Sequence, residues 1–182
     1  HDVAAIGKMP FESFNGDARR SLEWHERVLT ADNLEFLRTL PQHTKVRGDV
    51  TMAHGSPRDP VWEYIINTLS ARLNFDYFDT DFCFVGHSHI QCMFHLDPER
   101  NRISMEGPNQ NETIPLVGRM ILNPGSVGQP RDRDTRAAYA IFDPDAKTWE
   151  AHRVEYDVSE VQQRIRKANL PEKHAARLAE RW

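Results

Sequence analysis

The chain of 182 residues has few cysteines, no long apolar run and no cluster of basic residues. Its two cysteines, Cys83 and Cys92, stand inside apolar runs, which favours reduced, buried thiols in a cytoplasmic protein over a disulfide framework. No run approaches the roughly 18 apolar residues of a membrane-spanning helix. The formal net charge is −4 and Lys and Arg are scattered, which argues against extended nucleic-acid binding.

The length and the 39% of hydrophobic residues suit one domain with a substantial core. We therefore expect a single domain over residues 1–182, with its core in 1–156 and helices in 157–182. The sequence begins with His1 and not with Met, and we expect a domain that is truncated at its N-terminus.

The spacing of apolar residues changes along the chain from a helical period to the alternation of strands. It predicts helices at 17–29, 32–37 and 60–73, and two helical pieces split by Pro171 near the end. Strands are predicted at 45–53, 82–85, 90–96, 102–106, 114–122, 137–142 and 149–156. The pattern indicates an α/β fold with polar loops at the strand ends, where such sheets usually bind ligands.

Three of the nine histidines follow apolar strands. His54 ends the strand "VTMA", and His87 and His89 come after "FCFV". Residues i and i+2 of an extended segment point to one side, so we expect these rings to meet at one place. Neutral imidazole is a common ligand of Zn, Mn, Fe, Co and Ni, and the arrangement predicts a metal site. Five other histidines are expected at the surface or at helix ends, with ordinary hydrogen bonds. They are His25, His43, His95, His152 and His174.

Four motifs in order resemble those of the calcineurin-like metallophosphoesterases, in particular a small bacterial and archaeal phosphodiesterase-like branch. "FVGHSH" is similar to the Gly-His-x-His motif, "MAHGSP" to the strand-end His-Gly, and "HD" at positions 1 and 2 to the end of Gly-Asn-His-Asp. "LNPGSVGQPRD" at 122–132 resembles the Asn-Pro-Gly-Ser-Val-Gly segment. The resemblance covers roughly residues 1–156.

The resemblance implies the C-terminal part of a four-layer sandwich, in which two mixed β-sheets are flanked by helices. It implies a phosphodiesterase or phosphatase that hydrolyses a small-molecule or nucleotide phosphoester. The cofactors would be two divalent metal ions, Mn, Fe, Ni, Zn or Co, with a bridging hydroxide that attacks phosphorus.

The same resemblance assigns roles to individual residues. His54 and His87 would bind one metal ion and His89 the other, while His1 would be the catalytic residue that protonates the leaving group. The family's Asp-x-His, Gly-Asp and Gly-Asn precede its His-Asp and supply the remaining ligands, and none of them stands in that place in this chain. The Gly-Asp pairs at 16–17 and 48–49 follow His1 and no apolar strand, so they are not substitutes. We therefore expect this segment alone to be inactive or nearly so.

Further residues are expected to contribute to the site because of the loops in which they lie. Arg58 and Arg131 each lie in a loop with Pro and Asp, and a guanidinium there could fork onto a phosphate oxygen or bond to the adjacent Asp. Asn123 and Ser126 are expected to hold the metal-ligand loops in place. Aromatic side chains after "RDP" would wall a substrate pocket or belong to the core, namely Trp62 and Tyr64.

Two other functions are compatible with these residues. The first is a non-catalytic protein-interaction module on the same fold. The second is a structural metal site that only stabilises the fold. The joint presence of His1, His54, His87 and His89 favours the enzyme.

Overall fold

The computed structural model describes residues 1–46 and 50–179, without the side chains of 43–46. Two compact units are distinguished. The helical unit consists of His1–Pro41 and the described residues from Asp157 on, and the sheet unit consists of Gln42–Tyr156. The side chain of His43 and the Gly-Asp pair at 48–49 lie outside the described residues.

The helical unit contains the helices predicted at both ends of the chain. Its helices are α1 (Asp2–Ala5), η1 (Phe11–Ser13), α2 (Gly16–Val28), α3 (Ala31–Thr39), α5 (Val158–Lys167) and α6 (Glu172–Ala176). Asn15 and Thr30 cap α2 and α3 by accepting hydrogen bonds from backbone amides in the first turn. The ring of His174 donates to the carbonyl oxygen of Asp17 over 3.3 Å, which links α6 to α2. Leu22 and Ala175 are fully buried in this unit.

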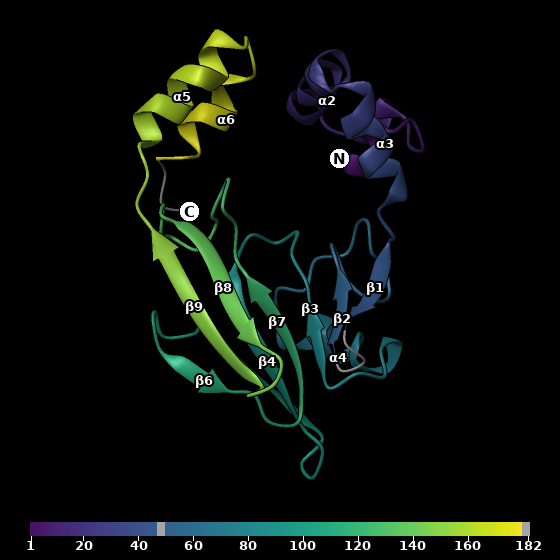
Figure 1. Ribbon diagram of the computed structural model, residues 1–182, viewed down its shortest axis with the longest axis vertical. Helices are drawn as coiled ribbons and strands as arrows, with labels where there is room; N and C mark the ends of the chain where they lie inside the picture. The colour runs from purple at the N-terminus through teal and green to yellow at the C-terminus, as the bar shows by residue number, and fades with distance from the viewer. Residues whose placement is uncertain (47–49, 180–182) are drawn as a thin grey trace. The chain divides into compact units, whose positions relative to one another are not determined.

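The sheet unit holds two β-sheets (Figure 1). The larger is mixed and has the order β1-β2-β3-β7-β4-β5, and the smaller has the order β6-β9-β8. The smaller sheet is antiparallel, with one parallel bridge from Gln110 to Ala151. The strands are β1 (His43–Val46), β2 (Val50–Ala53), β3 (Phe82–Phe84), β4 (Gln91–Asp97), β5 (Arg102–Glu106), β6 (Thr113–Pro115), β7 (Arg119–Pro124), β8 (Ala137–Asp143) and β9 (Thr148–Val154).

Alternating side chains of the larger sheet build a core on each of its faces. Phe82 of β3 and Leu122 of β7 face the smaller sheet, where they pack with Trp149 of β9. On the other face, Cys83 and Ile121 pack under Phe75, which belongs to the layer formed by α4 (Thr68–Arg72) and η2 (Phe75–Tyr77). The predicted α/β architecture with two sheets is therefore confirmed.

Both cysteines are buried and free, as the sequence predicts. Burial raises the pKa of each thiol, Cys83 and Cys92, to about 12. Both therefore stay protonated at neutral pH and serve as small apolar side chains of the core.

The predicted bounds of three elements were wrong. The strand predicted at 45–53 is two antiparallel strands, β1 and β2, with Val46 opposite Val50. Apolar and polar residues alternate in the same way in one long strand and in two consecutive antiparallel strands. The alternation alone therefore does not reveal that the chain reverses direction. The strand predicted at 114–122 is likewise β6 and β7, which lie in different sheets. Gly118 between them has φ +72, a value that glycine adopts at little cost and that turns the chain from one sheet to the other.

The helix predicted at 60–73 is confined to α4. The amides of Val61 and Trp62 donate to the carboxylate of Asp59 instead of joining a helix. Asn67 then starts α4 with a reciprocal pair of hydrogen bonds to Ser70. Residues 60–67 therefore form a loop that belongs to the site described below.

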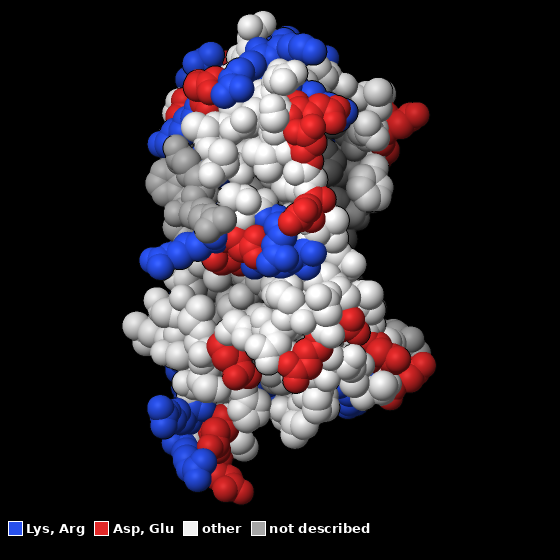
Figure 2. All heavy atoms as spheres, turned by 90° about the vertical axis from the view of Figure 1, so that its left-hand side faces the viewer, with Lys and Arg blue, Asp and Glu red and all other residues white. Residues whose placement is uncertain are grey.

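Among the described residues, none of the helices combines the length and the apolar character that crossing a bilayer requires. On the face drawn in Figure 2, Lys and Arg lie interspersed with Asp and Glu and form no continuous stripe of one sign.

Candidate metal centre

His54 stands directly after β2, where the chain turns sharply at Gly55. The amide of Gly55 donates to the carbonyl oxygen of Pro60 over 2.8 Å. A Cβ atom at Gly55 would lie 2.8 to 3.0 Å from the carbonyl oxygens of Asp59, Pro60 and Glu63. Only glycine fits here, and this close approach folds residues 55–63 back beside His54.

The partly buried carboxylate of Glu63 holds this loop together. Glu63 accepts hydrogen bonds from Ser56 Oγ over 2.5 Å and from Asn74 Nδ2 over 2.8 Å, and it forms an ion pair with Arg58. Burial alone raises the pKa of Glu63, but the hydrogen bonds from Arg58, Ser56 and Asn74 together bring it below its ordinary value. The guanidinium of Arg58 is thus paired with Glu63, and not with the adjacent Asp that the sequence suggested.

His87 and His89 lie on a bend, and the predicted extended segment at these residues was wrong. The strand β3 ends at Phe84, and the two histidines have φ values of 58° and 60°. Residues other than glycine in this left-handed region cost about 1–2 kcal/mol each. Two such residues within three positions indicate a loop whose conformation is imposed by its surroundings.

Asn123 at the end of β7 supplies part of that constraint. Its side chain is 1% exposed, and its amide donates to the Gly86 carbonyl over 2.8 Å and to Ser88 Oγ over 2.9 Å. The amide of Gly86 in turn donates to the carbonyl oxygen of His54 over 2.9 Å. The ends of β2, β3 and β7 are thereby joined at the histidines.

His54 and His87 meet side by side. Their rings lie 4.9 Å apart between centroids, with His54 Nε2 3.0 Å from His87 Nδ1. Burial, followed by the charges of His54 and His89, lowers the pKa of His87 to about 4. His87 is therefore neutral at pH 7, the form in which imidazole binds a metal ion. The other nitrogen, His87 Nε2, is buried without a hydrogen-bond partner among the described residues.

His89 is oriented from the opposite side by the loop after β7. Its Nδ1 donates to the carbonyl oxygen of Gln129 over 2.7 Å, which leaves the lone pair on Nε2 in the neutral ring. The amide of Gln129 donates to Ser126 Oγ over 3.0 Å, so Ser126 supports His89 indirectly. Burial, followed by the charge of Arg131, lowers the pKa of His89.

Arg131 differs from Arg58 in its surroundings. Its charge lowers the pKa of both His87 and His89, and its guanidinium donates to the neutral side chain of Gln129 over 3.2 Å. Its amide also donates to the carbonyl oxygen of His89. Arg131 is therefore the better placed of the two arginines for an anion beside the histidines.

The described side chains offer part of a ligand set for a metal ion. Among the described residues, no three side chains of His, Cys, Asp or Glu are arranged to hold one. His54 and His87 do offer two facing ring nitrogens, and imidazole nitrogens are common ligands of divalent transition metals. His1 lies in the helical unit, with its ring 5.0 Å from that of Phe14, and its role stays a prediction.

Sequence reasoning missed two supports of the site. The ring of Tyr64 stacks on His87 at 4.0 Å between centroids and 16° between planes. Arg153 of β9, whose side chain is 6% exposed, forms an ion pair with Asp132 next to Arg131. Both pairs join residues more than 20 positions apart, so no local pattern could have revealed them.

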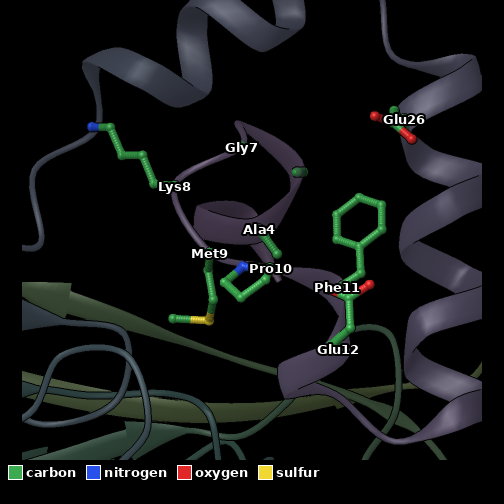
Figure 3. Close-up of a pocket in the computed structure, with 9 residues that line it drawn as sticks. Ala4, Gly7, Lys8, Met9, Pro10, Phe11, Glu12 and Glu26 are labelled. Carbon is green, nitrogen blue, oxygen red and sulfur yellow. The ribbon is translucent and has the colours of Figure 1, made fainter.

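A hollow of about 470 Å³ lies in the helical unit near α1 and is lined by Lys8, Phe11 and Glu26 among others. Figure 3 shows that Lys8 extends away from Phe11 and Glu26. The charged side chains that line this hollow therefore do not converge on one point.

No protein-family model matches the chain. It is 35% identical over 181 residues to the uncharacterized protein MJ0912 of Methanocaldococcus jannaschii, covering 94% of this chain and 69% of that protein. The crystal structure of a metallophosphoesterase from Sphaerobacter thermophilus is 46% identical with a TM-score of 0.86, over 98% of this chain and 73% of that chain. The hypothetical protein PH1004 from Pyrococcus horikoshii is 19% identical with a TM-score of 0.71, over 97% of this chain and 69% of that one, and shares the fold.

These likenesses place the fold among the metallophosphoesterase sandwiches. The chain belongs to the calcineurin-like metallophosphoesterase family, as its motifs predict.

Proposed function

We propose that the protein is a metal-dependent phosphoester hydrolase, a phosphodiesterase or phosphatase. The observation that carries the proposal is the facing pair of His54 Nε2 and His87 Nδ1, 3.0 Å apart. The likeness to a metallophosphoesterase at 46% identity supports the reaction class. Two divalent cations, when bound, would supply Lewis acidity to the phosphoryl oxygens and to the attacking water.

In this proposal each residue of the chain has one task. His54 and His87 hold one cation and His89 holds the other, with His89 Nε2 presented by the hydrogen bond from Nδ1 to Gln129. Arg131 orients an oxygen of the phosphoester by its charge. On the likeness of the motifs alone, His1 donates a proton to the oxygen of the departing alcohol.

Removal and return of the metal test this proposal. We expect the full-length protein to hydrolyse a generic aryl phosphodiester or aryl phosphomonoester, to lose that activity in EDTA, and to recover it with Mn²⁺ or Ni²⁺. The divalent cation supplies several kcal/mol of transition-state stabilisation, and the loss should therefore exceed a factor of about 100.

Two outcomes contradict the proposal. Hydrolysis that continues unchanged in EDTA would exclude the metal-dependent reaction. An absence of hydrolysis of either ester at saturating Mn²⁺ would favour the alternative, an interaction module on the same fold. Magnesium-loaded protein serves as a control for general stabilisation by divalent ions.

A further inference from the structure

The two histidines on the bend are oriented by different means. His89 is held by a hydrogen bond from Nδ1 to the Gln129 carbonyl. Metal-binding histidines almost always use their second ring nitrogen in this way. The second nitrogen of His87 has no such bond, because Nε2 is buried without a partner among the described residues. Something else must therefore fix the rotation of the His87 ring.

Tyr64 is the side chain in contact with the face of that ring. Its ring lies 4.0 Å from the imidazole between centroids, and the two planes differ by only 16°. A parallel contact at this distance opposes rotation of either ring, and aromatic pairs contribute about 0.5–1.5 kcal/mol beyond the area they bury. Tyr64 comes from the loop that Gly55 and Glu63 fold back beside His54.

We infer that Tyr64 is a positioning residue for His87, whose stacked ring holds the imidazole with Nδ1 facing His54 in place of the missing hydrogen bond. The inference rests on the proposed function, because the orientation of the His87 ring matters for function only if His87 binds a divalent cation. Tyr64 is 42% exposed, so its role is local to the site and not that of a core residue.

The chain contains a matched control for this pair. Tyr139 stacks on His152 with centroids 4.8 Å apart and 15° between planes, and Tyr139 is 39% exposed. This second pair lies on β8 and β9, in the smaller sheet. A variant of Tyr139 therefore shows the general effect of losing a tyrosine–histidine stack, and a variant of Tyr64 shows the effect of losing the stack on His87.

The test is calorimetric titration of the metal-free full-length protein with Mn²⁺. We expect Tyr64→Leu to weaken Mn²⁺ binding by about 10-fold, since supporting residues of metal-binding histidines typically contribute 10–100-fold. Tyr64→Phe, which keeps the stack, and Tyr139→Leu should bind within about twofold of the wild type. Should Tyr64→Leu fail to fold, Tyr64→Met gives the same comparison.

A second measurement separates positioning from simple destabilisation. The absorption spectrum of the Co²⁺-loaded protein reports ligand geometry, and it should change in Tyr64→Leu but not in Tyr139→Leu. Equal Mn²⁺ affinity of Tyr64→Leu and wild type would overturn the inference and leave the proposed function standing. A wild-type protein that binds none of Mn²⁺, Ni²⁺ and Co²⁺ would overturn the proposed function itself.

Discussion

Replacement of either facing histidine should abolish hydrolysis of phosphoesters. We expect His54→Ala and His87→Gly each to lower kcat/KM by about 1,000-fold or more, because several kcal/mol of metal-derived stabilisation depend on a pair of ligands. Glycine is chosen at position 87 because it accepts the φ of 58° found there. The measurement is hydrolysis of an aryl phosphoester by the full-length protein and its variants at saturating Mn²⁺.

A histidine outside the site provides the control for these two variants. His25 is exposed on α2, and His25→Ala should retain the activity of the wild type within about twofold. Circular dichroism would establish that all three variants are folded. The proposal fails if His54→Ala or His87→Gly keeps more than a tenth of the wild-type activity.

The largest effect on stability is expected at Gly125, in the turn after β7. A Cβ atom there would lie 2.7 Å from Ala138 Cβ and 3.2 Å from Gln91 Cβ, and the backbone has φ +87. Left-handed backbone costs an alanine about 1–2 kcal/mol, and overpacking costs about 1–3 kcal/mol. Gly125→Ala should therefore lower the free energy of unfolding by about 2–5 kcal/mol, as measured by urea denaturation.

Gly128 in the same loop is the matched control. A Cβ atom at Gly128 meets nothing within 4 Å. Gly128→Ala should therefore change the free energy of unfolding by less than about 0.5 kcal/mol. Equal unfolding free energies for Gly125→Ala and Gly128→Ala would show that the turn accepts a side chain at both positions and would contradict the packing described here.

Several features of the site were predictable because they depend on local sequence. His54 and His87 each follow an apolar strand, so their rings were expected to meet at one place, and they do. The polar segment after β7 was expected to support the same loops. The bonds of Asn123 to Gly86 and Ser88 have that geometry, while its part in metal binding stays a prediction.

Other features were not predictable because they depend on distant partners. The left-handed backbone of His87 and His89 is imposed by contacts from Asn123 and Gln129, about 35 to 40 positions away. The apolar spacing of residues 60–73 suits a helix, yet the carbonyls packed around Gly55 require a loop. Helical propensity is small per residue, and tertiary packing overrides it here.

In the proposed function, His54 and His87 together hold a divalent cation. The most direct measurement is an anomalous difference map from crystals of the protein grown with Mn²⁺. We expect a manganese peak bonded to both His54 Nε2 and His87 Nδ1. A map in which these two nitrogens stay hydrogen-bonded to each other, with no manganese between them at a saturating concentration, would contradict it.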